Sequence, residues 1–161
     1  MAKPGCVVAS VGGGGLLMGV LSGLADVGWA DVPVVAVETH GADALAQSLA
    51  AGELVTLPAI TSVAKSLGAD CTTERILRKC QDLGPDLVRP LVVSDAAAVR
   101  ACLAFADDHR VLVEPACGAA LAAVYDRAEA LEGLDDVVVE VCGGGIVTPA
   151  LLDQYKALID A

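Results

Sequence analysis

Ser10-Val11-Gly12-Gly13-Gly14-Gly15-Leu16-Leu17 joins an apolar run at 7–11 to a second apolar run at 16–24. This order predicts a buried strand, a tight loop and a helix. The N–H groups of such a loop lie at the positive end of the helix, where they favour a bound phosphate group. Glycines leave room for that group and tolerate positive φ. A tight turn that binds nothing is the alternative that these residues leave open.

The loop departs from two well-known nucleotide-binding motifs. A dinucleotide fingerprint requires glycine at its first, third and sixth positions. Counted from Gly12 the sixth position is Leu17, and counted from Gly13 it is Met18. A Walker A loop ends in Gly-Lys-Ser/Thr, whereas Val20 follows Gly19 here. The loop therefore favours a monophosphate held by backbone N–H groups.

Composition bounds the class of protein. The chain has 161 residues, of which 55% are hydrophobic, 19% charged and 2% aromatic, which is typical of one domain whose strands are buried on both faces. Its net charge of −11 disfavours nucleic acid and anionic membranes as partners. It has no apolar run of about 18–20 residues, which a membrane span requires. The six cysteines form no C-x-x-C pair, so we expect reduced thiols, no zinc site and a cytoplasmic location.

Strand-like and helical runs alternate along the sequence. We expect a single α/β domain over 1–161, with an open, mostly parallel sheet flanked by helices. Ser94 is expected to cap one helix, and Thr148 with Pro149 to begin another. Gly15, Gly19 and Gly23 are expected to form a smooth face against the sheet. The expected strands are 6–11, 33–38, 87–93, 111–113 and 137–142, and the expected helices are 16–27, 42–51, 73–83, 95–108, 118–131 and 149–159.

Four further segments resemble one family when they are taken with the glycine loop. They are 38–42 (ETHGA), 61–68 (TSVAKSLG), 113–120 (VEPACGAA) and 141–145 (VCGGG). In this order they resemble the catabolic L-serine/L-threonine dehydratases, which are pyridoxal-phosphate enzymes of fold type II. The resemblance covers nearly the whole chain.

The resemblance implies a cofactor site and a cation site. Cys142 would face the pyridine nitrogen of pyridoxal 5′-phosphate, although cysteine at the end of a strand is ordinarily a buried core thiol. Glu38 would help to bind potassium or another monovalent cation, although a carboxylate there could instead cap the next helix. Glu114 could line the site or be structural. The implied phosphate cradle is Gly12, Gly13, Gly14, Gly15 and Leu16, and the implied carbonyl ligands of the cation are Gly12, Ala42, Leu67 and Ala69.

The family converts L-serine to pyruvate and L-threonine to 2-oxobutanoate, with release of ammonia, and is commonly dimeric. Its Schiff-base lysine and its smaller, substrate-binding domain have no counterpart in this sequence, which resembles the C-terminal half of such an enzyme. No catalytic residue is therefore assigned, and these residues alone are not expected to turn over serine. One alternative is a non-catalytic phosphate-ligand module or regulatory remnant. Another is a different fold type II enzyme such as a cysteine synthase, against which Cys142 argues.

Overall fold

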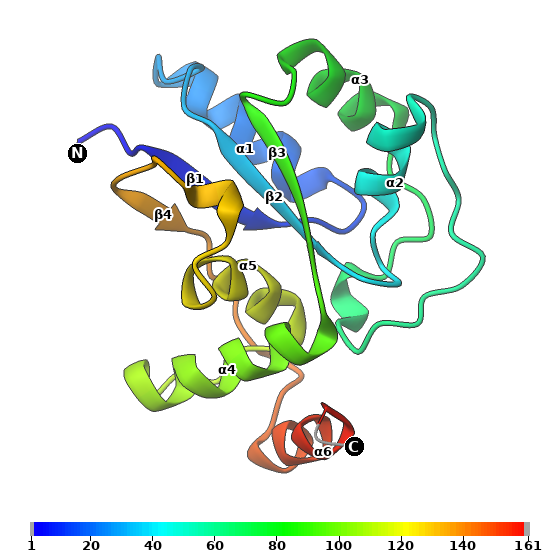
Figure 1. Cartoon of the computed structure of the whole chain (residues 1–161), viewed down its shortest axis with the longest axis vertical. Coiled ribbons are helices and arrows are strands. Elements are labelled where there is room, and N and C mark those ends of the chain that lie inside the picture. The colour runs from blue at the N-terminus through cyan, green and yellow to red at the C-terminus, as the bar shows by residue number, and fades with distance from the viewer. Residues whose placement is uncertain (1, 160–161) are drawn as a thin grey trace.

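Four parallel strands form the centre of the fold in the computed structural model, which describes residues 2–159. The strands are β1 (Cys6–Ser10), β2 (Val34–Thr39), β3 (Val88–Val93) and β4 (Val137–Val139), in the order β3-β2-β1-β4 (Figure 1). Each pairs with its neighbour in parallel. The expected open, parallel α/β sheet is confirmed.

Helices cover both faces of this sheet (Figure 1). One face packs against α1 (Gly15–Asp26), α2 (Ala44–Ala51) and α3 (Glu74–Leu83). The other packs against α5 (Pro115–Tyr125), with α4 (Asp95–His109) and α6 (Pro149–Ile159) outside it. Two short 3₁₀ helices, η1 (Lys65–Leu67) and η2 (Glu129–Leu131), lie in the connections.

The strand residues divide between two core clusters as the two-residue repeat of a strand requires. Val8 and Val35 pack in the cluster that contains the buried alanines of α5. Val7 and Val34 pack on the opposite face with Leu17 of α1. Because both faces are covered, β1 and β2 are buried along their whole length, which explains their unbroken apolar sequence.

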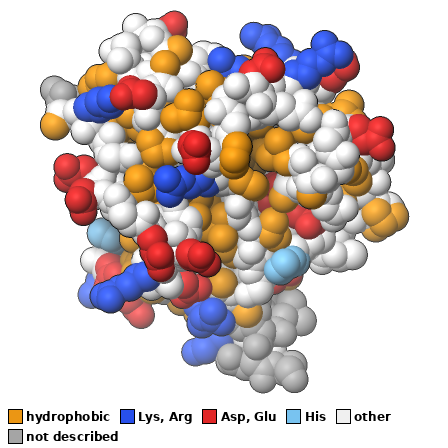
Figure 2. Space-filling view, turned by 45° about the horizontal axis from the view of Figure 1, so that its top comes forward, with side chains coloured by type: hydrophobic (Ala, Val, Ile, Leu, Met, Phe, Trp, Pro, Cys, Tyr) orange, Lys and Arg blue, Asp and Glu red, His pale blue; other side chains and the backbone are white. Residues whose placement is uncertain are grey.

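The surface mixes acidic and basic side chains, with hydrophobic side chains exposed between them (Figure 2). Val138 is 50% exposed because β4 is an edge strand of the sheet. All six cysteines are free, and four of them are buried. Within the part of the chain that the structure describes, no helix combines the length and apolar character needed to cross a membrane.

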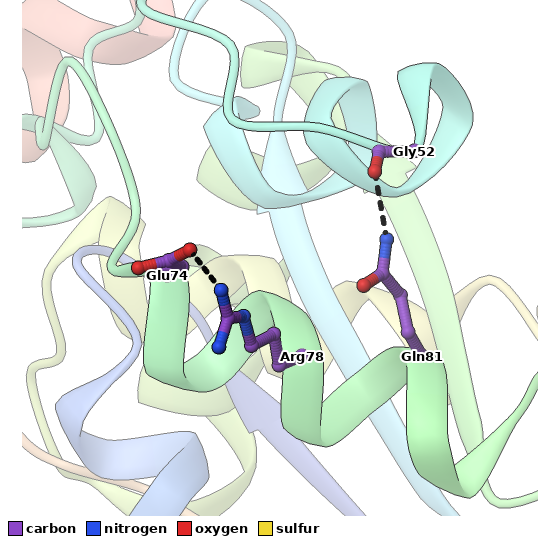
Figure 3. Close-up of polar contacts among 4 residues, drawn as sticks. All are labelled: Gly52, Glu74, Arg78 and Gln81. Carbon is purple, nitrogen blue, oxygen red and sulfur yellow. Dashed lines mark hydrogen bonds and ion pairs between the residues drawn. The ribbon is translucent and has the colours of Figure 1, made fainter.

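Side-chain contacts tie α3 to itself and to the end of α2 (Figure 3). Glu74 and Arg78 form an ion pair one turn apart on α3. The Gln81 amide donates to the Gly52 carbonyl at 3.0 Å, just beyond α2. Thr73 accepts from the Ile76 N–H at 3.4 Å and so caps α3. These contacts hold α3 in place beside the glycine loop, where the Ile76 side chain lies against Gly14.

Helices α4 and α5 approach closely at Gly118. A Cβ atom there would lie 2.2 Å from the Ala98 carbonyl oxygen and 2.5 Å from Cys102 Sγ. Only glycine allows this separation. The alanines of α5 extend the close packing to the sheet, so this helix is buried from Pro115 to Ala123.

The predicted strand at 111–113 is wrong. This segment joins α4 to α5 and pairs with no strand among residues 2–159. Val111 and Leu112 are exposed and Val113 is buried. Of these three residues, Val113 therefore packs into the core. A strand requires a partner for its hydrogen-bonding groups, and this segment has none in the described sheet.

Two further boundaries differ from expectation. The helix predicted at 118–131 begins at Pro115, because proline suits the first helical position, and ends at Tyr125. Arg127 then adopts a φ of 50°, which breaks the helix before η2. The strand predicted at 137–142 ends at Val139, whose register partner on β1 is Val8.

The glycine stripe of α1 does not face the sheet. Gly19 and Gly23 are exposed, and a Cβ atom at Gly15, Gly19 or Gly23 would meet nothing within 4 Å. The buried face of α1 consists of Leu17, Leu21 and Leu24. The leucine spacing therefore decided the orientation of the helix, as hydrophobic burial predicts.

The remaining elements agree with expectation to within two residues. Ser94 accepts from the Ala97 N–H at 3.1 Å and caps α4. Thr148 accepts from the Leu151 N–H at 3.2 Å, with Pro149 beginning α6. Both predicted caps are confirmed.

Candidate cofactor site

The strand order reverses direction at β1. From β1 the chain adds β2 and then β3 on one side, and finally places β4 on the other side. The segments that leave the carboxyl ends of β1 and β4 therefore diverge and open a crevice between them. In open α/β sheets ligands bind at such a switch point. The glycine loop follows β1 and Cys142 follows β4, so the fold brings these two predicted site elements together.

The glycine loop presents a row of free N–H groups. Those of residues 12–17 have no hydrogen-bond acceptor within residues 2–159. Gly14 is the N-cap of α1 with a φ of 91°, and no side chain caps the helix. A Cβ atom on Gly14 would lie 2.6 Å from Ile76 Cγ2, so both space and backbone conformation require glycine. This helix end can hold an anion through backbone groups alone.

A cavity of about 220 Å³ opens in front of this loop. Cys142, Glu114 and Ser66 also line it, and the Ser66 hydroxyl donates to Glu114 Oε2 at 2.9 Å. The Ser10 hydroxyl donates to the Ala116 carbonyl at 2.6 Å and joins the end of β1 to the start of α5. Glu114 therefore lines the cavity, one of the two possibilities that the sequence leaves open. The predicted cradle residues Gly12, Gly13, Gly14, Gly15 and Leu16 all line it.

Cys142 is exposed at the cavity, so the buried-core interpretation of this thiol is wrong. Its Sγ donates to Glu140 Oε2 at 2.7 Å. Partial desolvation of the thiol is the larger cause and the hydrogen bond to Glu140 the next, and together they raise the pKa of Cys142 to about 12. The sulfur therefore keeps its hydrogen at neutral pH. Glu140 was not recognised from the sequence, where it is a single acidic residue within a valine run.

Glu38 is 1% exposed at the end of β2. Its two carboxylate oxygens accept from the N–H groups of Leu45 at 2.9 Å and Ala46 at 2.7 Å, in the first turn of α2. The helix-capping function that the sequence left open is thus present. Burial raises the pKa of Glu38 to about 7, with the two backbone hydrogen bonds opposing that rise.

Some of the residues whose carbonyl oxygens are predicted to bind the cation lie close together. A Cβ atom on Gly12 would lie 3.4 Å from the Leu67 carbonyl oxygen, and one on Gly13 would lie 3.8 Å from Ala69 Cβ. Ala42 and Leu67 share one core cluster. Among residues 2–159 no group of three or more His, Cys, Asp or Glu side chains could hold a metal ion, so a cation here would depend on carbonyl groups beside Glu38.

A buried polar network holds the segment that carries Leu67 and Ala69. The Ser62 hydroxyl donates to Asp95 Oδ1 at 2.6 Å and lies 2.8 Å from Thr39 Oγ1. Asp95 Oδ2 accepts from the Val63 N–H at 3.0 Å. The network joins the end of β2, this segment and the start of α4. Its members are far apart in sequence, so no local pattern could have identified it.

Comparison with known proteins agrees with this geometry. The family of pyridoxal-phosphate dependent enzymes matches residues 1–143. An L-serine dehydratase/L-threonine deaminase from Bos taurus is 49% identical over 165 residues, which cover 96% of this chain and 49% of that protein. A serine dehydratase-like protein from Rattus norvegicus is also 49% identical and covers 98% of this chain and 49% of its own length. The chain thus spans about half the length of the curated relatives it matches.

Solved structures confirm the fold. A fungal L-serine ammonia-lyase from Rhizomucor miehei superposes with a TM-score of 0.89 at 41% identity, over 97% of this chain and 50% of that one. A threonine deaminase from Solanum lycopersicum shares the fold at 22% identity, with a TM-score of 0.82 over 99% of this chain and 43% of that one. The parallel sheet with its glycine loop, together with these matches, shows that the chain belongs to the pyridoxal-phosphate dependent enzymes of fold type II.

Proposed function

We propose that the glycine loop binds the phosphate group of pyridoxal 5′-phosphate through the N–H groups of Gly12, Gly13, Gly14, Gly15 and Leu16. The main observation in support of this proposal is the row of free N–H groups at 12–17, which line a cavity at the positive end of α1. The absent Cβ atoms leave the cradle open to the phosphate. When bound, the cofactor supplies an electron sink for electrons released at the substrate Cα.

Cys142 would face the pyridine nitrogen from the other side of the crevice. Its exposure in the same cavity as the loop supports this assignment. A thiol is a weak partner for a ring nitrogen compared with a carboxylate. A ring held in this way withdraws electrons moderately, which suits elimination of a β-hydroxyl group.

Glu38 and the carbonyl groups of Gly12, Ala42, Leu67 and Ala69 would hold a monovalent cation, with potassium as the expected ion. The buried carboxylate supports this proposal, because within residues 2–159 its hydrogen-bond donors are two backbone N–H groups and no cationic side chain. A hard cation prefers such oxygen ligands. Gly12 and Leu67 also line the cofactor cavity, so the cation would brace the wall of the cradle.

The reaction proposed for the complete site is the β-elimination of L-serine to pyruvate and ammonia, and of L-threonine to 2-oxobutanoate. The names of the Bos taurus and Rhizomucor miehei proteins support this substrate class. These residues would form one α/β cofactor-binding domain that binds the phosphate and orients the ring. The half of the relatives that the chain does not match would supply the Schiff-base lysine and the substrate carboxylate site. We further propose a homodimer in the cytoplasm.

The reaction is tested in a protein that joins these 161 residues to the half of the Bos taurus relative that they do not match. We expect pyruvate and ammonia from L-serine in equal amounts, and a large loss of both in the Gly15→Glu variant. The Gly23→Glu variant on the same helix is the matched control. Cofactor binding without any product from serine or threonine would instead favour a phosphate-ligand module.

A further inference from the structure

Glu114 precedes α5, and its side chain lies at the cavity in front of the glycine loop. It occupies the N-cap position of that helix, yet its carboxylate caps none of the helix N–H groups. Glu114 Oε2 instead accepts from the hydroxyl of Ser66, which lies 48 positions away in sequence, on η1. Within residues 2–159, Glu114 Oε1 accepts no hydrogen bond and the carboxylate forms no ion pair. Ser66 therefore holds the carboxylate by one oxygen and leaves the other available to a ligand.

The cavity has opposite electrostatic character at two places. The glycine loop presents N–H groups at the positive end of α1, which favour an anion. Among the described residues that line the cavity, Glu114 is the one carboxylate, and none is lysine, arginine or histidine. A partly buried carboxylate without a cationic partner is stabilised by a positive charge on a ligand. The cavity therefore matches a ligand that carries both a phosphate group and a cationic group.

We propose, on the basis of the function proposed above, that Glu114 binds a protonated amine in this cavity and that Ser66 is the positioning residue that directs its carboxylate. The amino-acid substrates of the proposed reaction carry such an amine as an ammonium group. A hydrogen bond between an ammonium group and a carboxylate is roughly twice as strong as one between neutral groups. Glu114 thus selects ligands with an amine over otherwise identical ligands with a hydroxyl group.

Two pyridine phosphates measure this selection in the 161-residue chain. Pyridoxamine 5′-phosphate carries a protonated amine on the carbon where pyridoxine 5′-phosphate carries a hydroxyl group, and the two share the ring and the phosphate group. Equilibrium dialysis at pH 7.5 and fixed ionic strength gives the Kd of each. We expect the parent chain to bind the amine roughly tenfold more tightly, as for a hydrogen bond to a charged group. Glu114→Gln keeps an oxygen that can accept from Ser66 but loses the charge, so it should bind the two ligands equally.

Two further variants separate the charge from its positioning. Ser66→Ala keeps the carboxylate but releases it, so the preference for the amine should fall without vanishing. Glu132→Gln, at an exposed position, is the matched control and should keep the full preference. Equal Kd values in the parent chain, or the same ratio in the parent chain and Glu114→Gln, would overturn the inference, and an unchanged ratio in Ser66→Ala would reject the positioning function of Ser66. Failure of the parent chain to bind either ligand would reject the proposed function as well.

Discussion

At the scale of single residues, Glu38 shows how one side chain can serve both stability and a binding site. Its carboxylate caps α2 through two N–H groups while it lies in the protein interior. The sequence suggested both a cap and a cation ligand, and the structure shows the cap. The buried charge gives this residue a measurable effect of pH on stability.

Ionisation of the Glu38 carboxyl group is predicted to destabilise the folded chain as the pH rises towards neutrality. Its pKa is raised from an ordinary value of 4.5 to about 7, so the folded state holds this proton more tightly than the unfolded state does. The resulting stabilisation is complete below about pH 4.5 and is lost as the pH rises through 7. The free energy of unfolding should fall by about 3 kcal/mol from this group.

Urea unfolding of the parent chain and of Glu38→Gln at pH 5 and pH 8, in tetramethylammonium buffer, measures this effect. Between pH 5 and pH 8, the free energy of unfolding of the parent chain should fall by about 3 kcal/mol relative to that of Glu38→Gln. Parallel pH profiles would contradict a buried, ionising carboxylate at this position.

Potassium is predicted to reverse part of that loss. A cation bound beside Glu38 favours the ionised carboxylate, so potassium should stabilise the parent chain at pH 8 and have little effect at pH 5. Glu38→Gln should show no specific stabilisation at either pH. The comparison of potassium with tetramethylammonium at equal ionic strength checks this, and equal stabilisation of both proteins would rule out the cation site.

At the scale of elements, α4 and α5 lie in close contact at Gly118. Gly118→Ala should lower the free energy of unfolding by about 1–3 kcal/mol, because the added Cβ overlaps the Ala98 carbonyl and forces the helices apart. Gly23→Ala, at an open position on α1, should instead raise it by about 0.5–1 kcal/mol. Chemical unfolding of both variants checks the pair, and a neutral Gly118→Ala would show that the contact can relax.

Element positions could be predicted where local chemistry decides them. Ser94 and Thr148 cap their helices as predicted because a cap depends on neighbouring residues. The segment 111–113 has the composition of a strand but no strand beside it, and only the tertiary fold could reveal that. The glycine stripe of α1 was assigned to the wrong side because the leucines, not the glycines, have the larger burial free energy.

At the scale of the whole molecule, the strand order decides where the site lies. Gly12 of the glycine loop and Cys142 are 130 positions apart in sequence, and the switch at β1 brings them to one cavity. The family resemblance implies that the glycine loop and Cys142 belong to one cofactor site. Ser62, Asp95 and Glu140 could not be predicted, because their functions depend on contacts across separate elements or on a side-chain direction that the sequence does not specify.

The central claim is that the glycine loop holds the cofactor phosphate, and equilibrium dialysis of the 161-residue chain with pyridoxal 5′-phosphate tests it most directly. Gly15 lines the cavity and a side chain there would be free of clashes, so Gly15→Glu should fold and place a negative charge in the cradle. We predict that its Kd rises by roughly tenfold or more, equivalent to about 1.4 kcal/mol, while Gly23→Glu binds like the parent chain. Equal affinity of all three proteins would contradict phosphate binding by the loop.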